Sequence, residues 1–114
     1  MEPSKNIDER IGEAWKVHYQ GQEDLAIQQF NDLVQEVPDN IDAYWGLGLS
    51  YRDAGDLASA AQVFQKAKDM IAAQLASEEI KNHERYLMLA RMVDQQLTQM
   101  DAFVAQSSQT ESSD

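Results

Sequence analysis

The fold is decided by residues 41–67, which read IDAYWGLGLSYRDAGDLASAAQVFQKA. Apolar residues recur in this stretch at spacings of three and four, the pattern of an amphipathic helix. Asn40 stands before it as an N-cap, and Gly55 followed by Asp56 marks the end of one helix and the cap of the next. The stretch therefore predicts two helices, over residues 41–54 and 57–76, joined by a tight turn.

The same pattern occurs 34 residues earlier, so that residues 7–40 align with residues 41–74. Asn6, Gly21 and Pro38 predict two more helices there, over residues 7–20 and 22–36. The identical pairs are Ile7/Ile41, Asp8/Asp42, Gly12/Gly46, Gly21/Gly55, Ala26/Ala60, Gln28/Gln62 and Phe30/Phe64. We expect the second helix to bury Leu25, Ala26, Phe30, Leu33 and Val37. A two-helix unit with a period in the thirties indicates a helical solenoid.

The repeat resembles the tetratricopeptide repeat (TPR). The second unit carries the family signature at Tyr44, Leu47, Gly48, Tyr51, Gly55, Ala60, Phe64 and Ala67. The first unit fits at Val17, Gly21, Ala26, Phe30 and Pro38, and departs from it at Arg10, Glu13 and Ala14, where an N-terminal unit tolerates exposed polar residues. The resemblance implies an all-α fold of TPR-like helical hairpins, an α–α superhelix, and we expect five helices in all.

The fifth helix should begin after Ser77 and run to about Val104, because no Gly or Pro interrupts it. We therefore divide the chain into an N-terminal extension (1–6), repeat one (7–40), repeat two (41–76), a capping or oligomerisation helix (77–104) and a disordered tail (105–114). Solenoids need a capping element, and the first half of this helix suffices for that. Its apolar stripe of Leu97, Met100 and Val104 is then a candidate self-association surface.

Composition restricts the function. Asp and Glu number 20 against 9 Lys and Arg, a net charge of −11 that disfavours binding to nucleic acid or to an anionic membrane. The chain has no cysteine, no apolar run long enough to span a bilayer and no signal peptide at its start, so a cytoplasmic location is expected. His18 and His83 each lie alone on a predicted helix without metal-ligand spacing, so we predict no metal, no cofactor and no enzymatic activity.

The resemblance also implies a binding groove lined by the first helix of each repeat. It places in that groove Ile11, Trp15, His18, Trp45, Leu49 and Arg52. Apolar anchors rimmed by acids favour a helical or extended partner segment with apolar and basic residues. The predicted function is a protein-interaction module: an adaptor, scaffold, assembly factor or accessory subunit. Two alternatives stay open: the fifth helix covers the groove, or the protein is structural and self-associates through that helix.

Overall fold

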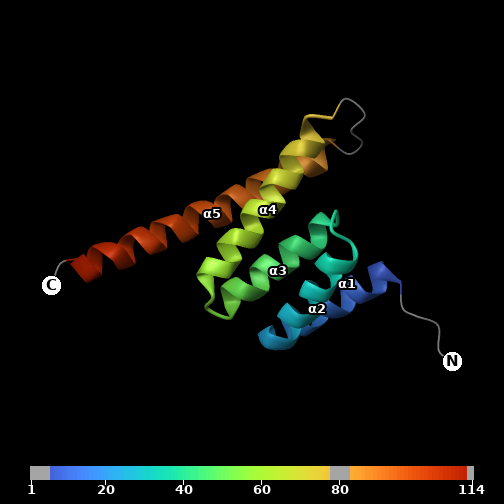
Figure 1. Ribbon diagram of the computed structural model, residues 1–114, viewed down its shortest axis with the longest axis horizontal. Coiled ribbons are helices and arrows are strands. Elements are labelled where there is room, and N and C mark those ends of the chain that lie inside the picture. The colour runs from blue at the N-terminus through green and yellow to red at the C-terminus, as the bar shows by residue number, and fades with distance from the viewer. Residues whose placement is uncertain (1–5, 78–82, 113–114) are drawn as a thin grey trace. The chain divides into compact units, whose positions relative to one another are not determined.

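The computed structural model describes residues 6–77 and 83–112, with side chains described up to residue 101. Within these ranges the chain forms five α-helices and no strand (Figure 1). They are α1 (Ile7–Tyr19), α2 (Glu23–Glu36), α3 (Ile41–Asp53), α4 (Leu57–Leu75) and α5 (His83–Ser112). The predicted all-α class and the five helices are confirmed. The chain divides within α4 into two compact units, Met1–Val63 and Phe64–Asp114.

The helices begin where side chains cap them. The Oδ1 atoms of Asn6 and Asn40, 34 residues apart, accept from the backbone N–H of Glu9 at 2.8 Å and of Ala43 at 3.1 Å. The Asp56 carboxylate accepts from the Ser59 N–H at 3.1 Å, which caps α4 in the same way. Each bond satisfies one of the donors that a helix N-terminus leaves unpaired.

The two turns inside the hairpins share one geometry. Gly21 and Gly55 adopt φ values of 80° and 89°, a left-handed conformation that glycine reaches without strain. The N–H groups of Gly21 and Gln22 reach back to the carbonyls of His18 and Val17, a Schellman motif that closes α1. Gly55 and Asp56 repeat the pattern at the end of α3. Local sequence therefore determines where both helices stop.

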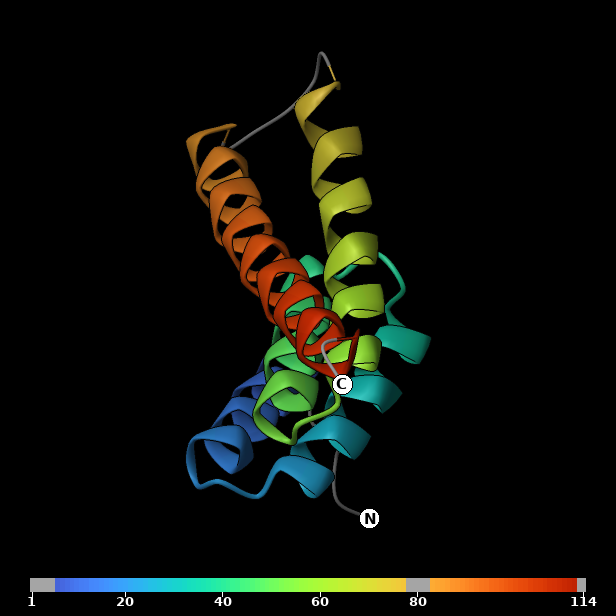
Figure 2. The same cartoon turned by 90° about the vertical axis from the view of Figure 1, so that its left-hand side faces the viewer.

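In the first unit α2 contacts both α1 and α3 (Figures 1 and 2). Its inward face consists of Ala26, Phe30, Leu33 and Val34, all buried. The prediction for Leu25 was wrong: its side chain is 40% exposed, because it lies about 100° around the helix from Ala26. Val37, after the last turn, is only half-buried, and Val34 contributes to the core in its place.

The second unit contains the rest of α4 together with α5. Phe64, Ala67 and Ile71 are buried along α4, as are Leu89, Val93 and Met100 along α5. The Lys68 ammonium and the Asp94 carboxylate, 3.1 Å apart, join the two helices on the surface. The predicted start of the fifth helix falls among residues 78–82, which lie outside the described part of the chain.

At its other end α5 differs from the prediction. The helix continues past Val104 to Ser112 without a break, so most of the segment expected to be disordered is helical. No Gly or Pro stands between residues 83 and 112, and each added residue extends the helix at the gain of one backbone hydrogen bond. The polar composition of this segment therefore does not end the helix.

The Asp56 cap should make stability depend on pH. Its hydrogen bonds with Ser59 hold the pKa of the Asp56 carboxyl below the ordinary value. A lowered folded-state pKa means that this contribution is present above the unfolded-state pKa and is lost as pH falls through the folded-state value. We expect Asp56→Ala to lower the urea midpoint at pH 7 and to make little difference near pH 2.

Asp56→Asn serves as the matched control, because asparagine also caps helices but does not titrate. Its urea midpoint at pH 7 should stay near that of the unmodified chain. If Asp56→Ala lowered the urea midpoint by the same amount at pH 7 and near pH 2, the charged carboxylate would not be responsible for the stabilisation.

Candidate functional site

The face predicted to bind a partner is built twice, on two helices that contact each other. Ile11, Trp15 and His18 follow one another at spacings of four and three on α1, and Trp45, Leu49 and Arg52 do the same on α3. We call these six residues the α1–α3 face. Residues at this spacing lie on one side of a helix. The internal repeat therefore places equivalent positions on neighbouring helices.

The α1 half of this face is partly used by the fold itself. Trp15 is half-buried and meets the fully buried Phe30 edge-on, with ring centroids 5.3 Å apart. On its other side Trp15 stacks on Tyr19 at 5.8 Å, and Tyr19 is 77% exposed. Ile11 also packs partly against the core. Trp15 thus connects the interior to an exposed aromatic ring that the sequence analysis did not single out.

The α3 half is also half-buried but contributes less to the core. Trp45, Leu49 and Arg52 are all half-buried, and neither Trp45 nor Leu49 belongs to the main hydrophobic cluster of the first unit. The Arg52 guanidinium binds the neighbouring Asp53 carboxylate, with Nε and Nη2 at 2.9 and 2.8 Å from Oδ1. On this face α3 therefore presents one aromatic side chain, Trp45, one aliphatic side chain, Leu49, and the charged Arg52.

His18 differs from its prediction as a surface contact. It is only 8% exposed, and its Nδ1 lies 2.8 Å from Oε2 of Glu23. The Ser50 hydroxyl lies 3.5 Å from the same nitrogen, and Asp53 Oδ2 lies 3.7 Å from Nε2. Ser50 is completely buried, so this arrangement does not offer a nucleophile to a substrate. Instead, His18 links the ends of three helices.

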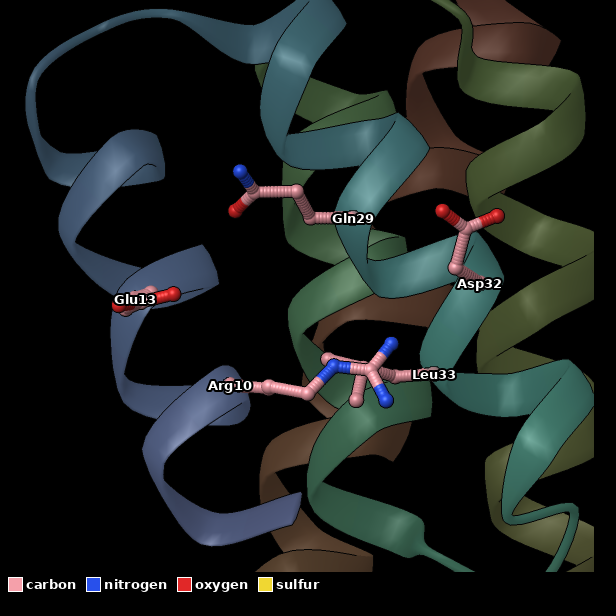
Figure 3. Close-up of a pocket in the computed structure, with 5 residues that line it drawn as sticks. All are labelled: Arg10, Glu13, Gln29, Asp32 and Leu33. Atoms are coloured by element: carbon pink, nitrogen blue, oxygen red, sulfur yellow. The ribbon is translucent and has the colours of Figure 1, made fainter. Parts of the chain in front are cut away.

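A small polar hollow of about 140 Å³ lies between α1 and α2 (Figure 3). Arg10 and Glu13 border it from α1, and Gln29, Asp32 and Leu33 border it from α2. Arg10 and Glu13 are two of the positions at which the first repeat departs from the family pattern, and their polar side chains face the hollow and solvent. The third departure, Ala14, is fully buried and belongs to the core.

An ion pair closes one end of this region. Arg10 donates to the Glu36 carboxylate, and that bond lowers the pKa of Glu36 and raises the pKa of Arg10. Among the described residues Gln29 Oε1 is the buried side-chain atom without a hydrogen-bond partner. The hollow is open and lined by charges of both signs, so we assign it no ligand.

The predicted self-association stripe on α5 is not uniformly exposed. Met100 is buried at 4% exposure, Leu97 is half-buried, and the side chain of Val104 lies outside the described residues. Among the α5 side chains that the structure describes, the exposed large apolar ones are Leu87, at 40%, and Met88, at 57%. Sequence spacing alone did not separate these two from the buried face.

The fold and the doubled α1–α3 face define an all-α helical repeat protein. A family model of the tetratricopeptide repeat matches residues 42–69, which extend from α3 into α4. Together with the five helices, this match supports a TPR-like helical repeat fold, as the sequence signature predicted. No curated protein matches the chain. Repeats of this class are typically protein-interaction modules rather than enzymes, and stacked repeats of this kind form extended binding surfaces. None of the described helices is both long enough and apolar enough to cross a membrane.

Proposed function

We propose that the chain is a non-catalytic interaction module that binds a helical or extended segment of another protein through the α1–α3 face. Trp15, Trp45, Leu49 and Ile11 supply apolar anchors, Arg52 supplies a polar contact, and His18 supports the face from within. Such a module acts as an adaptor, an assembly factor or an accessory subunit, and we place it in the cytoplasm.

One observation carries the proposal: two contacting helices present large apolar side chains at equivalent repeat positions that are half-buried rather than buried. Side chains that the fold alone required would lie in the core, as Phe30 does. Tryptophans held in part by their own fold are good anchors, because little of their freedom remains to be lost on binding.

The charge of the chain favours a basic partner. No Lys or Arg occurs between Lys16 and Arg52, and the acids of this segment are Glu23, Asp24, Asp32, Glu36, Asp39 and Asp42. All of them except Glu23 and Asp42 are exposed. Acidic surface accelerates the encounter with a positively charged segment and does so less at high salt. We therefore expect partner binding to weaken as ionic strength rises.

Trp45→Ala is the sharpest test of the binding face. Trp15 touches Phe30, so its removal would also disturb the core, whereas Trp45 lies outside the main cluster. If Trp45 is an anchor, its truncation should weaken a partner identified by affinity capture by roughly 30-fold, the effect of losing about 2 kcal/mol at an interface. The measurement is a titration of that partner with both forms of the chain, after circular dichroism has shown equal helicity.

Leu87→Ala/Met88→Ala is the matched control, since it removes exposed apolar surface from α5 and leaves the α1–α3 face intact. Equal affinity for the unmodified and Trp45→Ala chains, with a loss in the α5 variant, would move the binding surface to α5.

Self-association through α5 is the alternative function. The exposed Leu87 and Met88 give it a surface, although Met100 of the predicted stripe is buried. Light scattering across a range of concentrations separates the two functions. A mass of 12.9 kDa throughout favours the interaction module, and a dimer that the Leu87→Ala/Met88→Ala change dissolves favours the structural reading.

A further inference from the structure

Three helix ends converge on His18. His18 lies in the last turn of α1, Glu23 is the first residue of α2, and Asp53 is the last residue of α3. Each offers one ligand atom, and these atoms all lie within 4.8 Å of one another. We propose that His18, Glu23 and Asp53 form a binding site for a divalent transition-metal ion of the zinc class.

The distances suit a shared ion. A zinc ion binds nitrogen and carboxylate oxygen at about 2.0–2.2 Å, so two of its ligands lie no more than about 4.3 Å apart. Glu23 Oε2 lies 2.8 Å from Nδ1 of His18, and Asp53 Oδ2 lies 3.7 Å from Nε2 of the same ring. One ion binds only one of these two nitrogens, so the measure that matters is that one ligand atom from each residue lies within 4.8 Å of the other two, close to that limit. Small rotations of the two carboxylates are therefore enough to bring all three donors onto one ion.

The electrostatics of the cluster also call for a cation. Two carboxylates flank one imidazole ring, with Glu23 Oε2 2.8 Å from Nδ1 and Asp53 Oδ2 3.7 Å from Nε2. The two carboxylates repel each other, and water screens the Glu23 side more weakly than the Asp53 side, because the Glu23 side chain is 14% exposed and that of Asp53 39%. A bound cation turns this repulsion into two favourable contacts.

Access and support are both present. The Asp53 side chain is 39% exposed, so an ion has a path from solvent. Arg52 binds the other oxygen of Asp53 and leaves Oδ2 directed at the histidine. Ser50, fully buried beside the ring, helps hold the imidazole in place.

The ligand set indicates the class of metal. Imidazole favours zinc and its neighbours, whereas Mg²⁺ and Ca²⁺ favour all-oxygen sites. The ion would cross-link α1, α2 and α3 at the ends next to the α1–α3 face, and its remaining coordination positions would hold water. No metal was predicted from the sequence, because ligand spacing along a single helix does not reveal three ligands that come from three different helices.

Zinc titration of the full chain by isothermal calorimetry at pH 7.5 tests the proposal. We expect one zinc ion per chain with a micromolar Kd, and a rise in Tm when zinc is added. Mg²⁺ and Ca²⁺ at the same concentrations should produce neither effect. Cysteine thiolates do not compete, because the chain has none. In an NMR spectrum the His18 ring nitrogens should shift with zinc and those of His83 should not.

Three variants make the test decisive. Asp53→Asn is nearly isosteric and changes a side chain that is 39% exposed, so the fold should persist, and zinc binding should weaken at least about tenfold. Glu23→Gln should do the same, and His18→Gln should abolish binding. His83→Gln is the matched control, since His83 is an exposed histidine on α5, and it should leave the Kd unchanged. Absence of one-to-one binding at millimolar zinc, an unchanged Kd in Asp53→Asn and Glu23→Gln, or loss of binding in His83→Gln would each overturn the site.

Discussion

Replacing Gly46 by alanine is expected to lower the free energy of unfolding by about 1–3 kcal/mol, the cost of overpacking a filled core. Alanine normally stabilises a helix interior relative to glycine by up to about 1 kcal/mol. Here an added Cβ would overlap Cζ and Cε1 of Phe30 and come within 2.9 Å of Cε2. Phe30 is fully buried and meets Trp15 edge-on, so its ring has little room to move away.

The internal repeat supplies the control for this prediction. Gly12 occupies the aligned position in α1, and a Cβ there would meet nothing within 4 Å. Gly12→Ala should therefore raise the free energy of unfolding by roughly 0.5–1 kcal/mol. Urea denaturation of both variants measures the difference. Stabilisation by both substitutions would show that α2 and α3 do not approach as closely as Phe30 and Gly46 require.

Phe30→Ala should have a larger effect, a loss of about 3–5 kcal/mol. Its ring is completely buried, contacts Trp15 and fills the space that Gly46 leaves open. A small domain is stable by only about 5–15 kcal/mol, so this single change removes a large share of the total. Urea or thermal unfolding followed by circular dichroism measures the loss. Tyr19→Ala, at an aromatic side chain that is 77% exposed, should shift the transition far less.

A double variant separates a steric conflict from a general loss of stability. If the cost of Gly46→Ala comes from overlap with Phe30, it should disappear when Phe30 is already alanine. The free-energy changes of Phe30→Ala and Gly46→Ala would then be strongly non-additive, as expected for residues in direct contact. Additive changes would mean that Gly46→Ala acts through the α3 backbone.

Much of the fold could be read from local sequence. The caps at Asn6, Asn40 and Asp56 and the turns at Gly21 and Gly55 were predicted at the residues where they occur. Each depends on interactions within a few residues, which the sequence displays directly. The repeat extended this reading, because the identical Phe30 and Phe64 mark equivalent positions and both are fully buried.

The candidate site was predicted only in part. Spacing placed Ile11, Trp15, Trp45 and Leu49 on one face of each helix, but did not say how deeply each would be buried. Trp15 and Ile11 pack partly against the core, whereas Leu25 of α2 is 40% exposed. Both results follow from how α1 and α2 are rotated against each other. Burial depends on the exact rotation of a helix against its neighbour, and a pattern of threes and fours leaves that rotation uncertain by a residue.

Sequence by itself determined the five helices, their boundaries up to Leu75 and the repeat that pairs them. Only the tertiary structure showed that Gly46 makes room for Phe30, 16 residues away. It also showed that His18 contacts Ser50, 32 residues along the chain, and Glu23 at the start of the next helix. Helix ends are decided by backbone hydrogen bonds between residues close in the chain. Contacts between side chains on different helices depend on how the helices pack, which no short stretch of sequence specifies.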